Sequence, residues 1–349
     1  MAYTTINDPT AFFQTILYTG NATDDRSISG VGFQPDWLWV KERSATSGHI
    51  IVDSIRGATK FIQSHNTTAE DTNADIIQAF ESDGFEIGTH GAINENTQTY
   101  VAWNWKAGTS FTNDASATSV GSVDSAGSVS TDAGFSIINV VKNNTTAHTV
   151  AHGLGAVPQM IIGKSRTGSS YRWIVYHKDI GNTHALYLNE NFVKTDSVTF
   201  WNDTTPTSSV FSLGTDNSWN GTSIFYCFAE KQGYSKFGSY TGNNDDNGTF
   251  VYTGFKPAFV MVKITAGQTD NWIMQDNKIN SFNGASSQRL RPNSSGAEFS
   301  SSNEIDLLSN GFKTHGADGE INGSGFSYIY MAFAENPFVN SNGIPVNAR

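Results

Sequence analysis

One ten-residue pattern occurs three times in the chain and limits the folds that it can adopt. A glycine is followed three residues later by a proline and six residues further on by a lysine, with an apolar run before the lysine, at residues 32–41, 155–164 and 254–263. Glycine permits a turn that other residues resist, and proline opens an extended segment. The apolar run predicts a buried strand, and we expect the lysine to end it in solvent. Three copies indicate an internal repeat.

Other blocks recur in register around this pattern. Tyr18-Thr19-Gly20-Asn21 matches residues 240–243, and each copy closes with an aromatic strand in which Trp105, Phe228 and Phe333 are equivalent. We expect these three aromatic residues to be buried. Each copy has the length of a sandwich with about seven or eight short strands. The predicted fold class is therefore all-β, with tandem β-sandwich units of jelly-roll or lectin-like type in three internal repeats.

The repeats define the expected domains. These are residues 1–110, a first sandwich that begins with a docking arm; residues 111–133; residues 134–232, the second sandwich; and residues 233–349, the third. Residues 111–133 are rich in Ser, Gly and Ala, and they fit either a flexible linker or thin edge strands. Copies two and three meet at residues 230–233 without a linker, so we expect them to pack tightly.

Helical signal is nearly absent. Residues 69–80 carry Ile76, Ile77 and Phe80 at a spacing that suits one short helix, and residues 305–308 are expected to hold a matching turn. The lone cysteine, Cys227, excludes an internal disulfide, and we expect it to be a buried core residue.

Composition excludes several classes of partner. Only 15% of the residues are charged, the net charge is −11, and no segment concentrates lysine or arginine, so nucleic acid is not an expected partner. No apolar run approaches the ~20 residues of a membrane helix, so membrane insertion is not expected either. The start of the chain lacks the basic and apolar regions of a secretion signal. We expect a chain made in a cytoplasm.

Catalytic constellations are not evident. His49, Asp53 and Ser54 lie close together, but Asp53 aligns with His177 and Asp276 in the other copies, which is typical of a varied surface. No cluster of His, Cys and carboxylate residues has the spacing of a zinc site. The sequence therefore predicts a protein that is not an enzyme and has no cofactor, apart from the calcium considered next.

Two stretches are candidates for ligand contacts. Trp201-Asn202 and Trp219-Asn220 lie in polar segments rich in turn-forming residues. If the indole faces are exposed there, they suit stacking on a sugar, and the neighbouring amides suit hydrogen bonds to its hydroxyl groups. The alternative is that both tryptophans pack under loops. Asp245 and Asp246, in the loop at residues 243–248, offer oxygen ligands for calcium, although such loops are commonly turns without a metal.

The sequence resembles a family of bacteriophage virion proteins, mainly from marine phages. The matching text covers nearly the whole chain and includes residues 18–21, 32–36, 53–60, 100–108, 201–214, 233–243 and the closing 345–349. The resemblance implies a non-enzymatic particle component of tail-fibre, capsid-fibre or decoration type, located in the virion and bound to other virion proteins. Contact with the host surface is a further expectation. The alternative function is a carbohydrate-binding adhesin or lectin that recognises bacterial surface polysaccharide.

Symmetric assembly strengthens many weak contacts, so we expect a homo-oligomer, with a trimer favoured. The alternative is that the three copies within one chain form a pseudo-threefold head by themselves.

Overall fold

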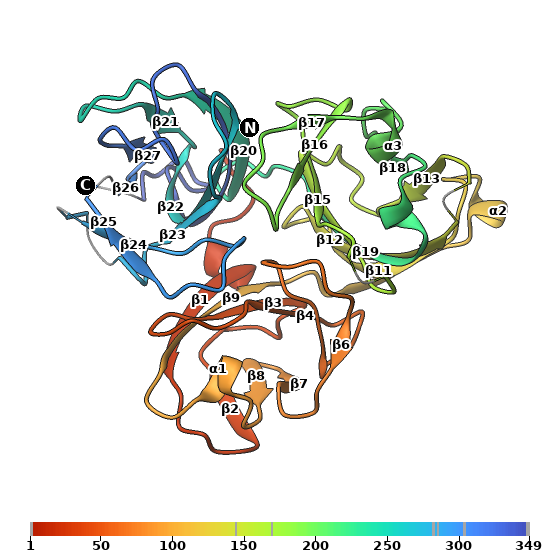
Figure 1. Ribbon diagram of the computed structural model, residues 1–349, viewed down its shortest axis with the longest axis horizontal. Coiled ribbons are helices and arrows are strands. Elements are labelled where there is room, and N and C mark those ends of the chain that lie inside the picture. Colours follow the sequence, from red (N-terminus) through yellow and green to blue (C-terminus); the bar gives the residue numbers. More distant parts are fainter. Residues whose placement is uncertain are drawn as a thin grey trace.

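Three β-sandwiches lie around a common centre in the computed structural model, which describes residues 3–143, 145–168, 170–280, 283–284, 286–302 and 305–346 (Figure 1). We call them unit 1, unit 2 and unit 3 in chain order. Each unit has an inner antiparallel sheet in which its first, last, third and fourth main strands are neighbours, and a smaller outer sheet. The predicted all-β fold class is confirmed.

Unit 1 has the inner order β1-β9-β3-β4 and the outer order β2-β8-β7. Its elements are η1 (Pro9–Ala11), β1 (Phe13–Thr19), β2 (Arg26–Ser29), β3 (Trp37–Glu42), β4 (Ile50–Asp53), β5 (Lys60–Phe61), β6 (Asp71–Thr72), β7 (Ile77–Glu81), β8 (Gly84–Ile87), α1 (Gly91–Asn94) and β9 (Thr99–Trp105).

Unit 2 has the inner order β12-β19-β14-β15 and the outer pair β13-β18. Its elements are β12 (Phe135–Lys142), β13 (His148–Ala151), β14 (Met160–Ser165), β15 (Ile174–His177), β16 (His184–Tyr187), β17 (Thr195–Asp196), α3 (Val198–Trp201), β18 (Val210–Leu213), η2 (Asn217–Trp219) and β19 (Gly221–Phe228).

Unit 3 has the inner order β20-β28-β22-β23 and the outer order β21-β27-β26. Its elements are β20 (Ser235–Thr241), β21 (Phe250–Tyr252), β22 (Phe255–Ala266), β23 (Ile273–Asp276), β24 (Ser287–Arg289), β25 (Phe299–Ser301), β26 (Ile305–Leu308), β27 (Gly311–Thr314) and β28 (Ser327–Pro337). The same inner strand order thus occurs in all three units.

The apolar runs of the repeated pattern are buried on both faces. In β3, Leu38 and Val40 face the outer sheet of unit 1 and belong to its own core, whereas Trp37 and Trp39 face the other two units. A strand covered on both sides needs an unbroken apolar run rather than an alternating one. This explains why the central run of each copy reads as continuously hydrophobic.

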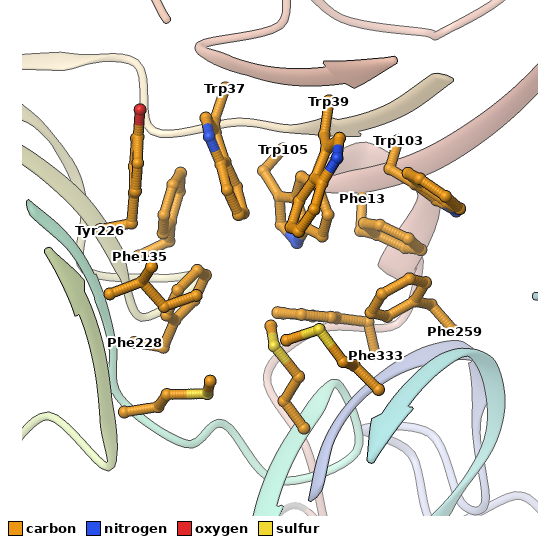
Figure 2. Close-up of a cluster of buried hydrophobic side chains, with 14 of the residues drawn as sticks. Phe13, Trp37, Trp39, Trp103, Trp105, Phe135, Tyr226, Phe228, Phe259 and Phe333 are labelled. Carbon is orange, nitrogen blue, oxygen red and sulfur yellow. The ribbon is translucent and has the colours of Figure 1, made fainter. Parts of the chain in front are cut away.

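The inner sheets of the three units share one core at the centre of the molecule. Figure 2 shows aromatic rings from all three sheets converging there. The ring of Trp37 lies 4.3 Å from that of Trp105 and 4.6 Å from that of Tyr226, and the ring of Phe333 lies 5.6 Å from that of Trp105 and 6.0 Å from that of Phe228. Trp105, Phe228 and Phe333 are each 1% exposed, so their predicted burial is confirmed.

Residues 107–133 form two edge strands instead of a linker. They contain β10 (Thr109–Asn113), the short helix α2 (Ala115–Thr118) and β11 (Ser125–Ser130). The two strands extend the inner sheet of unit 2 in the order β10-β11-β12, and Val129 is buried by this addition. Small residues suit this position because Gly127 lies so close to β12 that a side chain would meet the backbone of Ile137.

The short helix expected at residues 69–80 is absent, and β6 and β7 lie there instead. Strand β7 contains an irregularity between Ile77 and Ala79, where its pairing with β8 shifts register. Ile76, just before the strand, and Ile77, its first residue, are both buried in the core of unit 1. The turn expected at residues 305–308 is likewise strand β26.

The expected docking arm is folded against the molecule. Ile6 belongs to the shared core and Thr4 is 3% exposed, while the hydroxyl of Tyr3 donates a 2.7 Å hydrogen bond to the carbonyl of Gly254 in unit 3. Residues 1 and 2 lie outside the described residues. An apolar side chain at position 6 gains more from the core than from solvent, so the segment joins units 1 and 3. None of the helices in the described part of the chain has the length and apolar character needed to cross a membrane.

Candidate functional site

The two tryptophans proposed as sugar contacts are core residues of unit 2. Trp201 is 2% and Trp219 is 0% exposed, and their ring centroids lie 5.6 Å apart. The indole nitrogen of Trp219 donates a 3.0 Å hydrogen bond to the carbonyl of Phe200. The expectation of exposed stacking faces was therefore wrong, because α3 and η2 turn these residues inward. Asn202 and Asn220 are exposed and end these two helices.

The loop proposed to bind calcium is held by the protein itself. Asn322, which is 0% exposed, donates from its side-chain nitrogen to the side-chain oxygen of Asn243 at 3.0 Å and to the carbonyl of Asp245 at 3.2 Å. The carboxylate of Asp245 accepts from the backbone of Asn247 at 2.8 Å, and the carbonyl of Asp246 lies 2.7 Å from Nδ1 of His315. The described residues contain no group of three or more His, Cys, Asp or Glu side chains placed to hold a metal. The carboxylate of Asp245 and the backbone carbonyls of Asp245 and Asp246 are thus used in contacts within the protein.

The repeated Tyr-Thr-Gly-Asn motif has the same structural role in units 1 and 3. Tyr18 stacks on Tyr100 with centroids 5.0 Å apart, and Tyr240 stacks on Tyr328 at 4.9 Å. In unit 1 the loop after this motif is held by Asn94, the counterpart of Asn322, whose side chain accepts from Asn21 at 3.0 Å and donates to Thr23 at 2.8 Å. The repeated residues therefore serve the fold: they stack the rings and hold the loop in both units.

His49, Asp53 and Ser54 do not form a catalytic triad. Nδ1 of His49 accepts from the indole nitrogen of Trp39 at 2.8 Å, and Ser54 donates to Asp36 at 2.8 Å. Asp53 is buried and paired with Arg56. Each of the three side chains therefore has its own separate partner.

A surface hollow of about 680 Å³ lies over β10, β11 and β12 and is lined in part by Asp114 and Asp124. Asp114 caps α2 by accepting from Ser116 and Ala117, each at 3.0 Å, and Asp124 accepts from Ala115 at 2.9 Å. Both carboxylates are therefore used in helix capping.

The prediction that the lysine of the repeated pattern lies in solvent is wrong. Lys41, Lys164 and Lys263 are all 0% exposed instead of ending their strands in solvent. Each strand ends where its unit meets a neighbouring segment, so the side chain is covered and its ammonium group finds backbone carbonyls. Burial lowers the pKa of Lys41 and Lys164 to about 8 and that of Lys263 to about 7.

Two of these lysines join adjacent units. Nζ of Lys164 donates to the carbonyl of Thr67 in unit 1 at 3.2 Å, and Nζ of Lys263 donates to the carbonyl of Asn191 in unit 2 at 3.0 Å. Nζ of Lys41 donates to the carbonyl of Glu42. A lysine kept at one register position in three copies was the sequence signal for this role.

The same surfaces make further contacts at each boundary. The indole nitrogen of Trp173 donates to the carbonyl of Gln63 at 2.9 Å, and that of Trp272 donates to the carbonyl of Tyr187 at 2.9 Å. At the equivalent position, Nε2 of His49 lies 3.1 Å from the carbonyl of Arg291. Unit 2 thus contacts unit 1, unit 3 contacts unit 2, and unit 1 contacts unit 3 through equivalent segments. The arrangement is a closed head-to-tail ring within one chain.

Ion pairs reinforce two of the three boundaries. Arg43 of unit 1 pairs with Glu298 of unit 3 through contacts of 2.7 and 3.1 Å. Arg166 of unit 2 pairs with Glu70 of unit 1 through contacts of 2.8 and 2.9 Å. The third boundary has a 3.3 Å backbone hydrogen bond from Lys194 to Thr265 at the corresponding positions.

A family model described as a domain of unknown function, DUF7483, matches residues 8–337. The chain belongs to the DUF7483 family. The matched region begins just before η1 and ends at the last residue of β28, so all three units of this DUF7483 chain lie inside one family domain. No curated protein matches the chain.

The DUF7483 match therefore spans the shared core, apart from Ile6, and every boundary described above. At each boundary, the position occupied by Asp53, His177 or Asp276 directs a buried polar side chain toward the next unit. Asp276 accepts from the indole nitrogen of Trp103 at 3.1 Å, and Nε2 of His177 lies 3.3 Å from the carbonyl of Tyr330. The residue type at this position differs among the three units, which argued against a catalytic triad. The difference reflects how each unit is joined to its neighbour.

Proposed function

We propose that this DUF7483 protein is a non-enzymatic structural component of a bacteriophage particle, of tail-fibre, capsid-fibre or decoration type. The particle assignment is supported by the resemblance of the repeated text to phage virion proteins. Its partners are then other proteins of the virion.

The observation that carries the structural role is the shared core. Aromatic residues of all three inner sheets pack in one cluster, which fuses the sandwiches into a rigid body with few internal degrees of freedom. Such a body transmits force and holds its shape, as a particle component must. One chain already supplies three sheets around one centre, which favours the pseudo-threefold head over a homotrimer as the source of a threefold arrangement.

The use of polar side chains supports the absence of catalysis. The groups that recur at equivalent positions make contacts inside the chain: the lysines bind carbonyls, the asparagines hold loops, and the carboxylates of Glu70 and Glu298 pair with arginines. A catalytic site needs titratable groups that converge on a space open to substrate.

The adhesin alternative is not proposed. Its motive was the pair Trp201 and Trp219, and neither ring offers a face to a ligand.

The test is to locate the chain on purified particles of the phage that encodes it. Quantitative mass spectrometry should find it at a fixed copy number relative to the major capsid protein, and antibody-gold labelling should place it at one defined position. The particle-free fraction of the same lysate is the control. Particles that lack the chain would refute the assignment. Release of reducing ends from host polysaccharide by the purified protein would refute the non-enzymatic role.

A further inference from the structure

The three outer sheets each end in an edge strand at an equivalent position, and the three edges differ. These strands are β2, β13 and β21, whose central residues pair with a phenylalanine of the next strand: Ile28 with Phe85, Val150 with Phe211 and Val251 with Phe312. A free edge presents unpaired backbone groups to solvent, and proteins usually cover or blunt it.

The edge in unit 2 is covered by the chain itself. The backbone nitrogen of Ser122 donates to the carbonyl of Thr149 at 2.8 Å, and the backbone nitrogen of Thr149 donates to the hydroxyl of Ser122 at 2.9 Å. The hydroxyl of Ser125 donates to the carbonyl of Ala151 at 2.9 Å. The segment before β11 thus satisfies the outward backbone groups of β13.

The edge in unit 1 is blunted by polar and charged residues. Asp24, Asp25 and Arg26 precede its outward residues, which are serines, and Ser27 donates to the carboxylate of Glu81 at 2.8 Å. Charged residues beside an edge strand discourage pairing with another strand.

The edge in unit 3 has no strand paired to it among the described residues. Asp245 and Asp246 lie in the loop before it, as Asp24 and Asp25 do in unit 1, but its outward residues are aromatic where those of unit 1 are serines. Residues 247–254 contain no charged side chain, and Phe250 and Tyr252 are 46% and 53% exposed. The backbone carbonyl of Thr249 accepts from the backbone nitrogen of Thr314 at 3.1 Å, and the backbone nitrogen of Thr253 donates to the carbonyl of Asn310 at 3.0 Å, both on the β27 side of the sheet. Since antiparallel bonding alternates along a strand, the backbone groups of Phe250 and Tyr252 point to the free edge, and no partner for them occurs among the described residues.

This edge is complementary to itself. If two β21 strands pair antiparallel about a twofold axis at Val251, Phe250 of each copy lies opposite Tyr252 of the other, and both outward pairs exchange two hydrogen bonds. The aromatic side chains of Phe250 and Tyr252 then form cross-strand pairs.

We propose that two copies of this chain associate through β21, in antiparallel register with Phe250 opposite Tyr252 of the partner subunit. The outer sheets of the two units 3 then form one continuous sheet across the twofold axis. This inference is independent of the phage assignment, because it rests on the edge alone.

Register-specific cross-linking tests the pairing. Phe250→Cys and Tyr252→Cys proteins are mixed under a mild oxidant; the native Cys227 is buried and does not interfere. Paired residues in this register have Cα atoms about 5.5 Å apart, within disulfide range, whereas two copies of the same variant place their cysteines on a diagonal of roughly 7–8 Å, which is unfavourable. The mixture should form a cross-linked dimer at least about fivefold more than either variant alone.

The matched control is the mixture of Ser27→Cys and Ser29→Cys, which occupies the equivalent positions on the edge of unit 1 and should not cross-link. Equal cross-linking in the two mixtures, or in the single variants, would overturn the proposed register.

Sedimentation equilibrium supplies a second readout. The wild-type chain should show a concentration-dependent dimer that strengthens with salt, since each copy has a net charge of −11. Tyr252→Pro removes an outward N–H while leaving the β27 ladder intact, so it should abolish the dimer; Tyr252→Phe should retain it. A wild-type chain that stays monomeric up to about 200 µM, or a dimer that survives Tyr252→Pro in a folded protein, contradicts the proposal.

Discussion

The phenol of Tyr226 in unit 2 donates a 2.7 Å hydrogen bond to Oδ2 of Asp53 in unit 1. Both side chains are fully buried, and the same carboxylate is paired with Arg56. Burial and the neighbouring carboxylate raise the pKa of Tyr226 well above its usual value, so the phenol remains a donor. A polar contact inside the apolar centre therefore sets how two of the sandwiches meet.

Tyr226→Phe should lower the free energy of unfolding by about 1–3 kcal/mol, because Asp53 loses one donor in a site that water does not reach. Denaturant titration followed by fluorescence measures the change. The matched control is Tyr234→Phe: the hydroxyl of Tyr234 is buried without a partner among the described residues, so its removal should be neutral or stabilising. A Tyr226→Phe protein as stable as wild type would show that the contact contributes nothing.

The aromatic residues at the centre should each be costly to truncate. Replacing Trp105, Phe228 or Phe333 by alanine should lower the free energy of unfolding by ~3–5 kcal/mol, since the cavity lies in a core that three sheets share. Val141→Ala, at a position 65% exposed, is the control and should change little. A loss below ~1 kcal/mol at any of the three would show that the core relaxes around that position.

Stability should rise with pH above neutrality because of the buried lysines. When the pKa of a base is lower in the folded state than in the unfolded state, the folded protein binds fewer protons at any pH between these two pKa values. The free energy of unfolding therefore increases as the pH rises through that interval. For Lys263 the interval runs from about 7 to the ordinary lysine value of 10.5. Lys263→Met should therefore reduce the gain in unfolding free energy between pH 7 and 9.5.

The exposed Val141 offers the control for this experiment, because Val141→Ala changes no titratable group and should leave the pH dependence as it is in wild type. An unchanged slope in Lys263→Met would mean that Lys263 does not titrate in this range.

The two inter-unit ion pairs should differ in strength. Glu70 binds Arg166 and also lies 3.5 Å from Arg56, whose side chain is 0% exposed, whereas Glu298 pairs with the partly exposed Arg43. Glu70→Ala should therefore destabilise by about 2–3 kcal/mol and Glu298→Ala by about 1 kcal/mol or less. Thermal and denaturant unfolding of the two variants side by side measures the difference. The reverse order would indicate that Glu70 contributes little to holding Arg56.

Repetition made much of the fold readable from the sequence. The strands were predicted correctly from the three apolar runs, and the turns from the Tyr-Thr-Gly-Asn motif. The burial of Trp105, Phe228 and Phe333 was predicted from their alignment. Each of these follows from local propensity and periodicity. The burial of Lys41 and its equivalents was not predicted, since a lysine at a strand end reads as a solvent residue until its neighbouring unit is known. For Trp201 and Trp219 the sequence left exposure and packing under loops as alternatives, because polar neighbouring residues do not show which way a short helix turns its side chains.

Closure of the ring has a consequence for synthesis. The first and third units contact each other through Arg43 and Glu298, and Phe333 fills the centre, yet these partners lie far apart in the chain. A ribosome releases the N-terminal part first, so the inner faces of units 1 and 2 remain uncovered until nearly the whole chain has emerged. During that interval Trp37 and its neighbours form an exposed aromatic surface that is prone to aggregation. The nascent chain should therefore depend on chaperones in proportion to the time needed to translate unit 3, and slow codons there should lower the yield of folded protein.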